Sequence, residues 1–340
     1  MREAKAGLPR TIDWVDGAIA IIDQTALPAE MRVVRIETTD ALIEAISRLA
    51  VRGAPALGAA GALGVALAAT TAEGDEADVY AQVQEAAERL RRARPTAVNL
   101  AWGIERALGS LKAGPGAVLA EALKILEEDA IANRRIGERG ARLLSELGLD
   151  QVSALTHCNT GALACVEWGT ALGVLRQLQA ENRLRRVIAT ETRPLLQGAR
   201  LTAFELSQMG VDHEVIVDSA AAFVLSSHMA DVAIVGADRI AANGDVANKI
   251  GTLGIALAAA HAGVPFIVAA PESTIDPATP DGAGITVEQR DGTEVTSIGG
   301  TRTAPLTTPG LNPAFDVTPT ELVTAVVTDE RVLPGGRSQA

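Results

Sequence analysis

Two titratable residues, Cys158 and Asp238, each come just after a short apolar run, and together they could form an acid–base pair. A cysteine that precedes a helix start has a lowered pKa, and the residues after Cys158 predict a helix. Burial at the end of an apolar strand would raise the pKa of Asp238 and suit it to proton transfer near neutral pH. Structural roles are the alternatives, because a free cysteine also fills apolar corners and an aspartate can cap a turn.

A candidate phosphate site follows Asp238 along the chain. Asn248 and Lys249 come just before Gly251-Thr252, where the pattern predicts the start of a helix. Backbone N–H groups at a helix N-terminus attract anions, and a nearby lysine adds a full positive charge. Asn248 and Lys249 are therefore candidate substrate-binding residues.

Two arginines in the first half of the chain could also bind an anion. Arg52 stands just ahead of a predicted helix with Pro55 in its first turn, and Gly53 would let a ligand approach the backbone. Arg94 lies in a loop before another predicted helix. The alternative for both arginines is a surface ion pair, which is the commoner use of this residue.

The second half of the chain predicts an α/β unit with a parallel sheet. From Gly148 onward, β-branched runs alternate with helical segments at residues 161–179, 195–210 and 252–263. The runs are VSALT, RVIAT, EVIV, VAIVG and PFIVAA. Ligands bind at the carboxyl ends of strands in such sheets, and the unusual polar residues, Gln197 included, all follow strand ends. Glu191 and Arg193 could pair with each other and shape the cavity.

The first half predicts a small sheet followed by a helical bundle. Residues 11–36 hold short β-rich runs with a hairpin turn at Asp16-Gly17, and Thr38 or Thr39 can cap the next helix. Helical periodicity then covers residues 54–72, 76–93, 97–112 and 118–147. We therefore predict an α/β protein of two domains. Residues 1–147 form the N-terminal β/helical domain, and residues 148–340 form a Rossmann-like catalytic domain.

Composition argues against several classes of function. The 340 residues are 48% hydrophobic with a net charge of −12, so a nucleic-acid surface is not expected, although local arginines could bind a small anion. Two cysteines and four scattered histidines form no metal-binding pattern. The glycine-containing apolar stretch 54–72 predicts a buried helix rather than a membrane span. Met1–Lys5 leads into polar sequence unlike a signal peptide, so we expect a cytoplasmic protein.

Five motifs, taken together and in order, resemble the methylthioribose-1-phosphate isomerase family. They lie between about Arg52 and Pro271 and read VRGAPALG, RPTAVNL, THCNTGALA, ETRPLLQGARLTAFEL and GADRIAANGDVANKIGT. That family belongs with the regulatory subunits of translation initiation factor 2B and the archaeal ribose-1,5-bisphosphate isomerases. The resemblance implies a homodimer that needs no metal, nucleotide or other cofactor. No GxGxxG motif follows the first predicted strand of the α/β unit, which also argues against a dinucleotide enzyme.

The resemblance implies that 5-methylthioribose 1-phosphate is converted to 5-methylthioribulose 1-phosphate in methionine salvage. The family's catalytic cysteine and aspartate match Cys158 and Asp238. Its substrate-binding positions match Arg52, Gly53, Ala54, Arg94, Gln197, Asn248 and Lys249. Asp238 would protonate the ring oxygen during ring opening, and Cys158 would handle the C2 hydrogen as a base. A hydride shift, with the pair acting only on oxygens, is the open alternative.

Two other functions compete with this interpretation. A ribose-1,5-bisphosphate isomerase would need extra cationic groups for its second phosphate, whereas the residues after Gly53 are apolar, as a methylthio group prefers. A non-catalytic regulatory subunit has no need for both Cys158 and Asp238. Other 5-deoxypentose 1-phosphates as substrates, the ionisation of Cys158 at rest and the extent of domain closure stay open.

Overall fold

The computed structural model describes residues 8–95 and 97–339. The prediction from Met1–Lys5 lies outside these residues. The chain forms two compact units: one holds the residues up to Arg134 together with Thr160–Gly169, and the other holds Arg135–Asn159 and the chain from Thr170 onward. Helix α5 (Pro115–Glu146) contributes to both units, because its last part packs into the core of the second unit through Ile136 and Leu144. This division differs from the domain boundary at residues 147 and 148, which stays a prediction.

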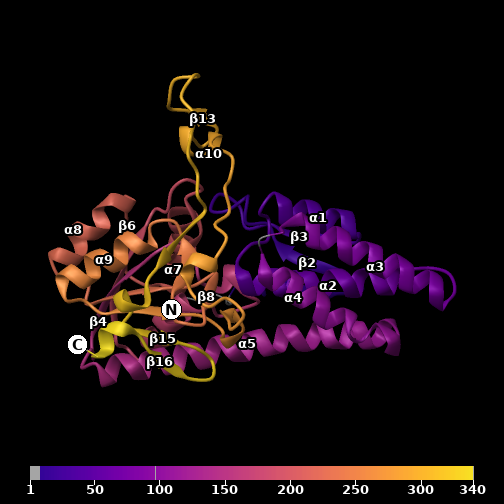
Figure 1. The fold of residues 1–340 in the computed structure, drawn as a ribbon, viewed down its shortest axis with the longest axis horizontal. Coiled ribbons are helices and arrows are strands. Elements are labelled where there is room, and N and C mark those ends of the chain that lie inside the picture. Colours follow the sequence, from indigo (N-terminus) through magenta and orange to yellow (C-terminus); the bar gives the residue numbers. More distant parts are fainter. Residues whose placement is uncertain (1–7, 96, 340) are drawn as a thin grey trace, which may run out of the picture. The chain divides into compact units, whose positions relative to one another are not determined.

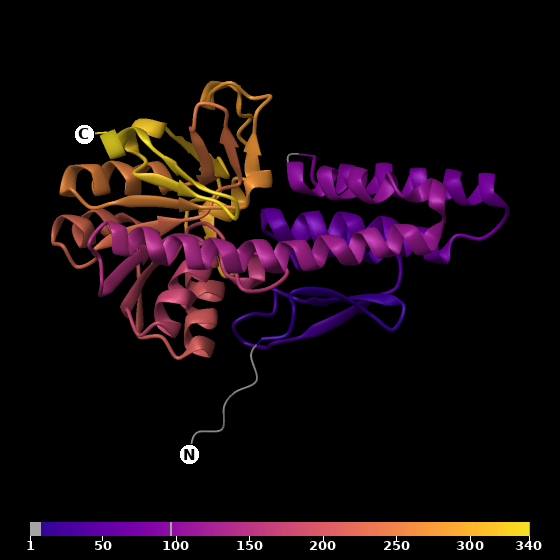
Figure 2. The same ribbon diagram turned by 90° about the horizontal axis from the view of Figure 1, so that it is seen from below.

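A three-stranded antiparallel sheet opens the first unit. It consists of β1 (Ile12–Val15), β2 (Ala18–Ile22) and β3 (Val33–Ile36). Asp16 and Gly17 have φ angles of 49° and 81°, as a tight turn between twisted strands requires, so the predicted hairpin is confirmed. Figure 2 shows these indigo strands on one side of the helices of this unit.

Four helices and the first part of α5 complete the first unit. They are α1 (Thr39–Ser47), α2 (Ala54–Thr71), α3 (Glu76–Ala93) and α4 (Val98–Leu108). The Thr38 hydroxyl accepts a hydrogen bond from the Ala41 N–H, which confirms the predicted cap of α1. By length and composition α2 could span a membrane, but 78% of it is buried in the structure, as the sequence predicted. A Cβ at Gly103 of α4 would collide with the Gly58 carbonyl, so the glycines let α2 and α4 approach closely.

A seven-stranded sheet forms the centre of the second unit. Its order is β16-β15-β10-β7-β4-β5-β6, and all neighbours are parallel except β15 and β16. The strands are β4 (Val152–Thr156), β5 (Leu184–Thr190), β6 (His213–Ile216), β7 (Val232–Val235), β10 (Phe266–Ala269), β15 (Ala325–Val327) and β16 (Val332–Pro334). The five predicted strands and the Rossmann-like sheet are confirmed. β5 and then β6 are added on one side of β4, and the chain then crosses to the other side of β4, where β7 pairs with it.

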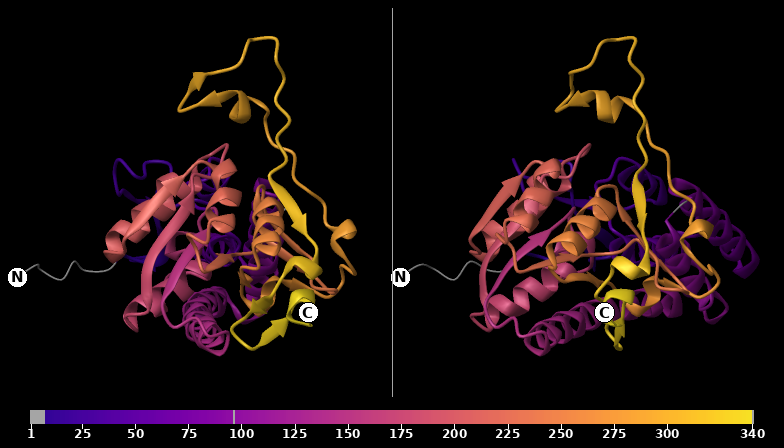
Figure 3. Two further views of the ribbon diagram at one scale, coloured as in Figure 1. Left: turned by 90° about the vertical axis from the view of Figure 1, so that its left-hand side faces the viewer. Right: turned by 60° about the vertical axis from the view of Figure 1, so that its left-hand side comes forward.

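Helices cover both faces of this sheet (Figure 3). α6 (Ala171–Ala180), α7 (Ala203–Met209) and the end of α5 pack on one face. α8 (Ala221–Ser226) and α9 (Thr252–Ala262) pack on the other. Side chains alternate between the faces along β4. Ala154 packs in the core under α6 and α7, and Leu155 packs in the core under α8 and α9.

The helix predicted over residues 161–179 is wrong in its first half. Only a short 3-10 turn at Ala162–Ala164 follows Cys158, and α6 begins at Ala171. Gly161 and Gly169 form an isolated antiparallel bridge so close that a Cβ on Gly169 would overlap Gly161. This close approach closes a loop that helical periodicity cannot reveal.

Two smaller sheets were not predicted. β8 (Arg239–Ala241), β9 (Val246–Lys249), β11 (Ile275–Asp276) and β14 (Phe315–Thr318) form a sheet in the order β11-β8-β9-β14. Residues 286–313 form an arm that contains α10 (Thr293–Thr296), β12 (Ser297–Ile298) and β13 (Thr301–Arg302). Figure 1 shows this arm projecting from the rest of the second unit.

Candidate active site

The point where the sheet order reverses lies between β4 and β7, and the two predicted catalytic residues follow these two strands. Ala154 pairs with Val232 in the parallel register, and the Thr156 hydroxyl donates to the Ile234 carbonyl over 2.8 Å. Cys158 is the second residue after β4, and Asp238 is the third residue after β7. Adjacent strands are about 4.8 Å apart. Open α/β sheets bind ligands at this reversal, outside the carboxyl ends of the strands.

The backbone of Cys158 is held on both sides by threonine hydroxyls. Its N–H donates to Thr192 Oγ1 over 2.9 Å, and Thr202 Oγ1 donates to its carbonyl over 2.6 Å. Cys158 is buried and has a φ of 60°. A left-handed conformation costs a residue other than glycine about 1–3 kcal/mol, and such residues persist where their surroundings fix them. The structure therefore fixes the backbone that carries the thiol.

The predicted reason for a lowered thiol pKa is wrong. A lowered pKa required a helix to start just after Cys158, and the next α-helix begins at Ala171. A 3-10 turn of three residues at Ala162–Ala164 has too few aligned peptide groups to act as a helix dipole.

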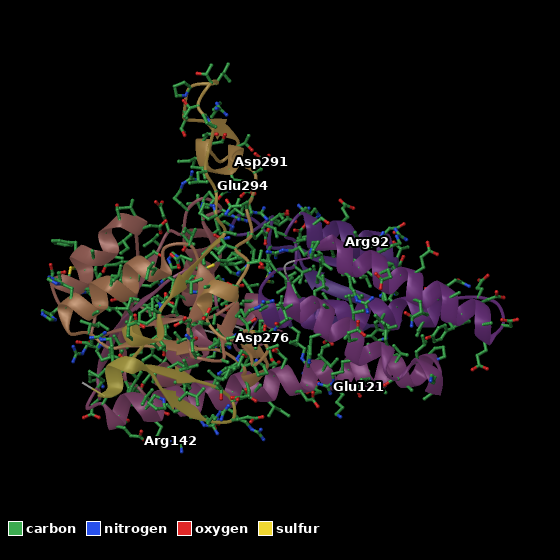
Figure 4. The ribbon with its side chains drawn as sticks, viewed as in Figure 1. Arg92, Glu121, Arg142, Asp276, Asp291 and Glu294 are labelled. Atoms are coloured by element: carbon green, nitrogen blue, oxygen red, sulfur yellow. The ribbon has the colours of Figure 1, made fainter. Side chains whose placement is uncertain are left out.

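Asp238 lies half-buried in the short connection between β7 and β8. Its N–H donates to the Ala247 carbonyl over 2.9 Å, which ties it to β9. The next residue, Arg239, pairs with Asp276 of β11 at 3.6 Å, and Figure 4 labels that aspartate. The hairpin that follows is fastened by Asp245, whose carboxylate accepts the N–H groups of Gly282 and Thr320. Asp245 is therefore an organising residue of the loops and not only a turn residue.

Asn248 and Lys249 stand at the end of β9. The Lys249 ammonium donates to the Ala314 carbonyl over 2.9 Å and lies 4.6 Å from the centre of the Phe315 ring. The buried Asn248 amide donates to Thr252 Oγ1 over 3.0 Å. β14 thus holds Lys249 from one side, while Asn248 links the strand to the first turn of α9.

The start of α9 already holds an anion, the carboxylate of Asp316. Asp316 accepts the N–H groups of Gly251 and Leu253 over 2.7 and 3.1 Å. The prediction that the Gly251 N–H serves a bound phosphate is therefore wrong. Burial raises the pKa of Asp316, and the two N–H groups offset part of that rise.

Replacing Asp316 with asparagine should destabilise the protein by about 1 kcal/mol, because an amide offers only one acceptor oxygen to the two N–H groups. Urea unfolding followed by circular dichroism measures the difference. Asp75→Asn is the matched control, since Asp75 caps α3 at an exposed position where asparagine caps equally well. Equal stability changes in the two variants would contradict the assignment of Asp316 as a buried cap.

Gln197 presents a buried polar atom that a ligand could bind. Its side chain is 7% exposed, and its Oε1 has no hydrogen-bond partner among residues 8–95 and 97–339. Buried polar atoms are nearly always paired, so an unpaired one needs an explanation. A π-helical turn follows at Gly198–Thr202, a feature frequent at functional sites. A Cβ at Gly198 would collide with the Thr190 carbonyl, so only glycine fits there.

The first unit contains the other predicted binding residues. Arg52 is buried, and its Nε donates to Gln24 Oε1 over 3.1 Å, while the Gln24 amide donates to the Leu163 carbonyl over 2.7 Å. Gly53 has a φ of 96°, and a Cβ there would collide with Ala164. Ala54 begins α2, and the half-buried Arg94 follows α3. Sequence reasoning missed Gln24, because nothing in its neighbourhood signals that it orients Arg52.

Arg193 does not pair with Glu191 as suggested. Its guanidinium donates instead to carbonyls of the arm, including Val295 at 2.8 Å and Ser297 at 3.3 Å. Figure 4 labels two other residues of the arm, Asp291 and Glu294. A cavity of about 230 Å³ lies there, lined by Arg193, Asp218, Gly251 and residues of the arm. Neither Cys158 nor Asp238 lines it.

His157, next to Cys158, is buried as a neutral imidazole. Its Nε2 lies 2.8 Å from the Ile250 carbonyl and its Nδ1 lies 2.6 Å from Thr190 Oγ1. Burial lowers its pKa below the usual 6.5, Lys249 lowers it further, and the Ile250 carbonyl and Asp218 oppose the shift.

We expect acid to destabilise the fold through His157. Below about pH 6.5 the unfolded imidazole takes up a proton that the buried one resists, so the unfolded state binds more protons and the free energy of unfolding falls. The slope contributed by one proton is at most about 1.4 kcal/mol per pH unit. Urea unfolding at pH 7.5, 6.5 and 5.5 should show a steeper loss for wild type than for His157→Asn. His228→Asn, at an exposed position, is the control. Equal slopes in wild type and His157→Asn would contradict the prediction.

A family model described as the initiation factor 2 subunit family matches residues 50–335. The chain belongs to this family. Among relatives, a methylthioribose-1-phosphate isomerase of Xanthomonas oryzae pv. oryzae is 49% identical, and the match covers 95% of this chain and 92% of the relative. A probable bifunctional methylthioribose-1-phosphate isomerase/methylthioribulose-1-phosphate dehydratase of Nocardia farcinica is 50% identical over 96% of this chain, which spans 59% of that relative.

Solved structures of similar proteins share the fold. The 5-methylthioribose 1-phosphate isomerase of Pyrococcus horikoshii matches with a TM-score of 0.90 and 41% identity over 98% of this chain and 95% of that one. A structure named as translation initiation factor 2B subunit delta, from A. fulgidus, matches with a TM-score of 0.86 and 45% identity over 96% of each chain. The matched structures thus include one named as an enzyme and one named as a factor subunit.

Proposed function

We propose that this protein is an aldose–ketose isomerase that converts 5-methylthioribose 1-phosphate to 5-methylthioribulose 1-phosphate in methionine salvage. The isomerase names of relatives 46–50% identical over most of the chain support the substrate. One observation of the molecule carries the chemistry: Cys158 and Asp238 follow the two adjacent strands on either side of the reversal in sheet order. A purely regulatory protein has no use for a thiol and a carboxylate at that point.

The reaction must open a sugar ring whose C1 carries a phosphate, so it cannot pass through a simple free aldehyde. In the proposed mechanism Asp238 donates a proton to the ring oxygen while the bond between C1 and that ring oxygen breaks. Cys158 then removes the C2 proton as a base, which gives an enol between C1 and C2. A proton is returned to C1, and the C2 hydroxyl gives up its proton to the Asp238 carboxylate, so that the ketone forms at C2. In the competing mechanism the C2 hydrogen moves to C1 as a hydride, and the pair acts only on oxygens. General acid–base catalysis of either kind contributes about 10²–10⁴-fold to the rate.

Binding in this proposal uses the groups around the strand ends. The Lys249 ammonium offsets one of the two negative charges of the phosphate dianion, and Asn248 supports the strand that carries Lys249. The Gln197 Oε1 accepts a hydrogen bond from a sugar hydroxyl, which would explain why no described residue pairs with it. Arg52, Gly53, Ala54 and Arg94 stay predicted substrate-binding residues of the first unit.

Product formation in deuterated water tests the proposal. Purified protein is mixed with 5-methylthioribose 1-phosphate, and the product is followed by NMR, with ribose 1,5-bisphosphate as a parallel substrate. We expect a ketone from the methylthio sugar only. Deuterium at C1 would support proton transfer through an exchangeable base. A C1 that carries two protium atoms and no deuterium would support a hydride shift or transfer of a shielded proton. If only ribose 1,5-bisphosphate gives a ketone, that sugar, and not 5-methylthioribose 1-phosphate, is the substrate.

A regulatory subunit of the initiation factor 2B type is the second candidate function. It is favoured by the likeness to the A. fulgidus protein, which is named as a factor subunit and is 45% identical to this chain. Inertness of the pure protein toward both sugars would support this candidate and overturn the isomerase. The NMR experiment therefore separates the two functions without a partner protein.

The proposal includes a homodimer in the cytoplasm that requires no metal or organic cofactor. The family resemblance supports each of these features. Light scattering coupled to gel filtration measures the mass against the 35.1 kDa of one chain. Turnover in the presence of EDTA tests the independence from metal.

A further inference from the structure

We propose that His157 is a positioning residue that fixes Cys158 and the turn after Lys249 relative to each other. The inference rests on the proposed function, which assigns Cys158 to catalysis and Lys249 to phosphate binding. His157 itself touches no reacting atom in this proposal. It acts through the two segments that its ring nitrogens bind.

The hydrogen bonds of His157 define its tautomer. A carbonyl oxygen can only accept, so Nε2, which lies 2.8 Å from the Ile250 carbonyl, carries the hydrogen. Nδ1 of the neutral ring then accepts from the Thr190 hydroxyl at 2.6 Å. The side chain is 1% exposed, so water does not compete for either bond. One imidazole thus joins the end of β5 to the turn that begins α9.

The chain of hydrogen bonds continues to Cys158. Thr190 Oγ1 and Thr192 Oγ1 lie 3.2 Å apart, and the Cys158 N–H donates to Thr192 Oγ1 over 2.9 Å. A continuous path therefore runs from the Ile250 carbonyl through His157 and two threonines to the backbone of Cys158. Ile250 directly follows Lys249 in the chain. One end of the path therefore lies at Cys158 and the other lies beside Lys249, the two residues that the proposed reaction needs in a fixed relative position.

Backbone geometry shows that this path supports an unusual conformation. Thr192 has a φ of 63°, which is rare for a β-branched residue, and Cys158 has a φ of 60°. The two left-handed residues are bound directly to each other by the hydrogen bond above. On the other side of the imidazole, Gly251 has a φ of 105°, and a Cβ there would lie 3.1 Å from His157 Cε1. The ring is thus packed against the turn as well as bonded to it.

The charged groups that face the imidazole act in opposite directions. Asp218, from the segment after β6, favours a charged ring, and its own carboxylate accepts the N–H groups of Thr192 and Arg193. Lys249, from β9, disfavours a charged ring. A protonated ring would turn Nδ1 into a donor and require the Thr190 hydroxyl to reverse, so the neutral form is the one that completes the path.

Two substitutions separate the two bonds of His157. In His157→Asn the side-chain oxygen can replace Nδ1 as acceptor for Thr190, and the bond to Ile250 is lost. In His157→Gln the amide can replace Nε2 as donor to Ile250, and the bond to Thr190 is lost. We expect His157→Asn to raise KM about 10-fold with kcat changed less than about 3-fold. We expect His157→Gln to lower kcat about 10-fold with KM nearly unchanged.

Alkylation of Cys158 by iodoacetamide gives a readout that does not depend on turnover. Peptide mass spectrometry separates it from Cys165, the buried internal control. Loss of the Thr190 bond should loosen the backbone of Cys158 and speed its alkylation about 10-fold in His157→Gln, with less than about a 2-fold change in His157→Asn. Equal changes in both variants, in step with their melting temperatures, would reduce His157 to a structural residue and overturn the proposal.

Thr192 gives a second test if the histidine variants do not fold. Thr192→Val removes the hydroxyl with little change in shape, and Thr192→Ser keeps it. The valine variant should show faster alkylation of Cys158, and the serine variant should restore the wild-type rate. Equal rates in the two variants would overturn the hydrogen-bonded path. If the wild-type protein turns over neither sugar, the proposed isomerase function is wrong. The alkylation rates would still test the hydrogen-bonded path, because they do not depend on turnover.

Discussion

Cys158→Ser and Asp238→Asn should each lower kcat for 5-methylthioribose 1-phosphate by about 10²–10⁴-fold, the usual contribution of a positioned acid or base. A serine hydroxyl is a far weaker acid than a thiol, so it supplies no anionic base near neutral pH. An asparagine amide cannot release the proton that ring opening requires. Both changes nearly preserve side-chain volume, so the loss is chemical. Stopped assays with NMR or coupled detection measure the rates.

The double variant and a matched cysteine change make this prediction specific. If the two residues act as a pair, the double variant should be about as slow as the slower single one, because the effects of residues that act as a unit do not add. Cys165→Ser is the control, since Cys165 is also buried and its thiol lies 3.6 Å from Asn133 Oδ1, a polar partner that serine can keep. Retention of more than about a tenth of the wild-type kcat by either single variant would contradict the assigned chemistry.

Lys249→Met should lower kcat/KM by about 10–100-fold, which is the worth of a charge-assisted hydrogen bond to a phosphate. Methionine keeps the apolar stem that packs on Phe315, so the variant removes the charge and little else. The same factor should appear in the inhibition constant of inorganic phosphate, which carries no sugar. Steady-state kinetics with and without phosphate measure both quantities.

An exposed lysine supplies the control for this second prediction. Lys124 has an exposed side chain and pairs only loosely with Glu128, at 3.7 Å. Lys124→Met should therefore leave kcat/KM and phosphate inhibition unchanged. An unchanged phosphate inhibition constant in Lys249→Met would remove Lys249 from phosphate binding, even if catalysis fell.

The parts of the fold that were predictable are those encoded by short, contiguous patterns. Five strands of the parallel sheet have four to seven residues and contain the β-branched runs from which they were predicted. The three-residue strand β15 was not predicted. Because parallel strands place their carboxyl ends at one edge, the residues just after them could be selected as site candidates. Cys158 and Asp238 were found in this way, without any knowledge of which strands are neighbours.

The parts that were not predictable depend on contacts between distant segments. Asp316 caps a helix that begins 64 positions earlier in the chain, at Thr252, and nothing near either residue indicates the other. Gly161 and Gly169 close a loop in a segment whose periodicity is helical. The threonine hydroxyls around Cys158 come from the segment just after β5 and from the π-helical turn before α7. A local sequence pattern can indicate which residues are candidates for a role. The roles described here depend on contacts with residues that are distant in the sequence.

The discontinuous first unit has a consequence for how the chain can fold during synthesis. Gly53 and Gln24 pack on Ala164 and Leu163, which belong to the same unit but are made after Cys158. A nascent chain released at residue 147 would lack this segment and leave the buried Gln24 amide without its carbonyl acceptor. The N-terminal unit therefore cannot finish folding on the ribosome until the chain has emerged past Gly169, and two fragments cut at residue 147 should need each other to become stable.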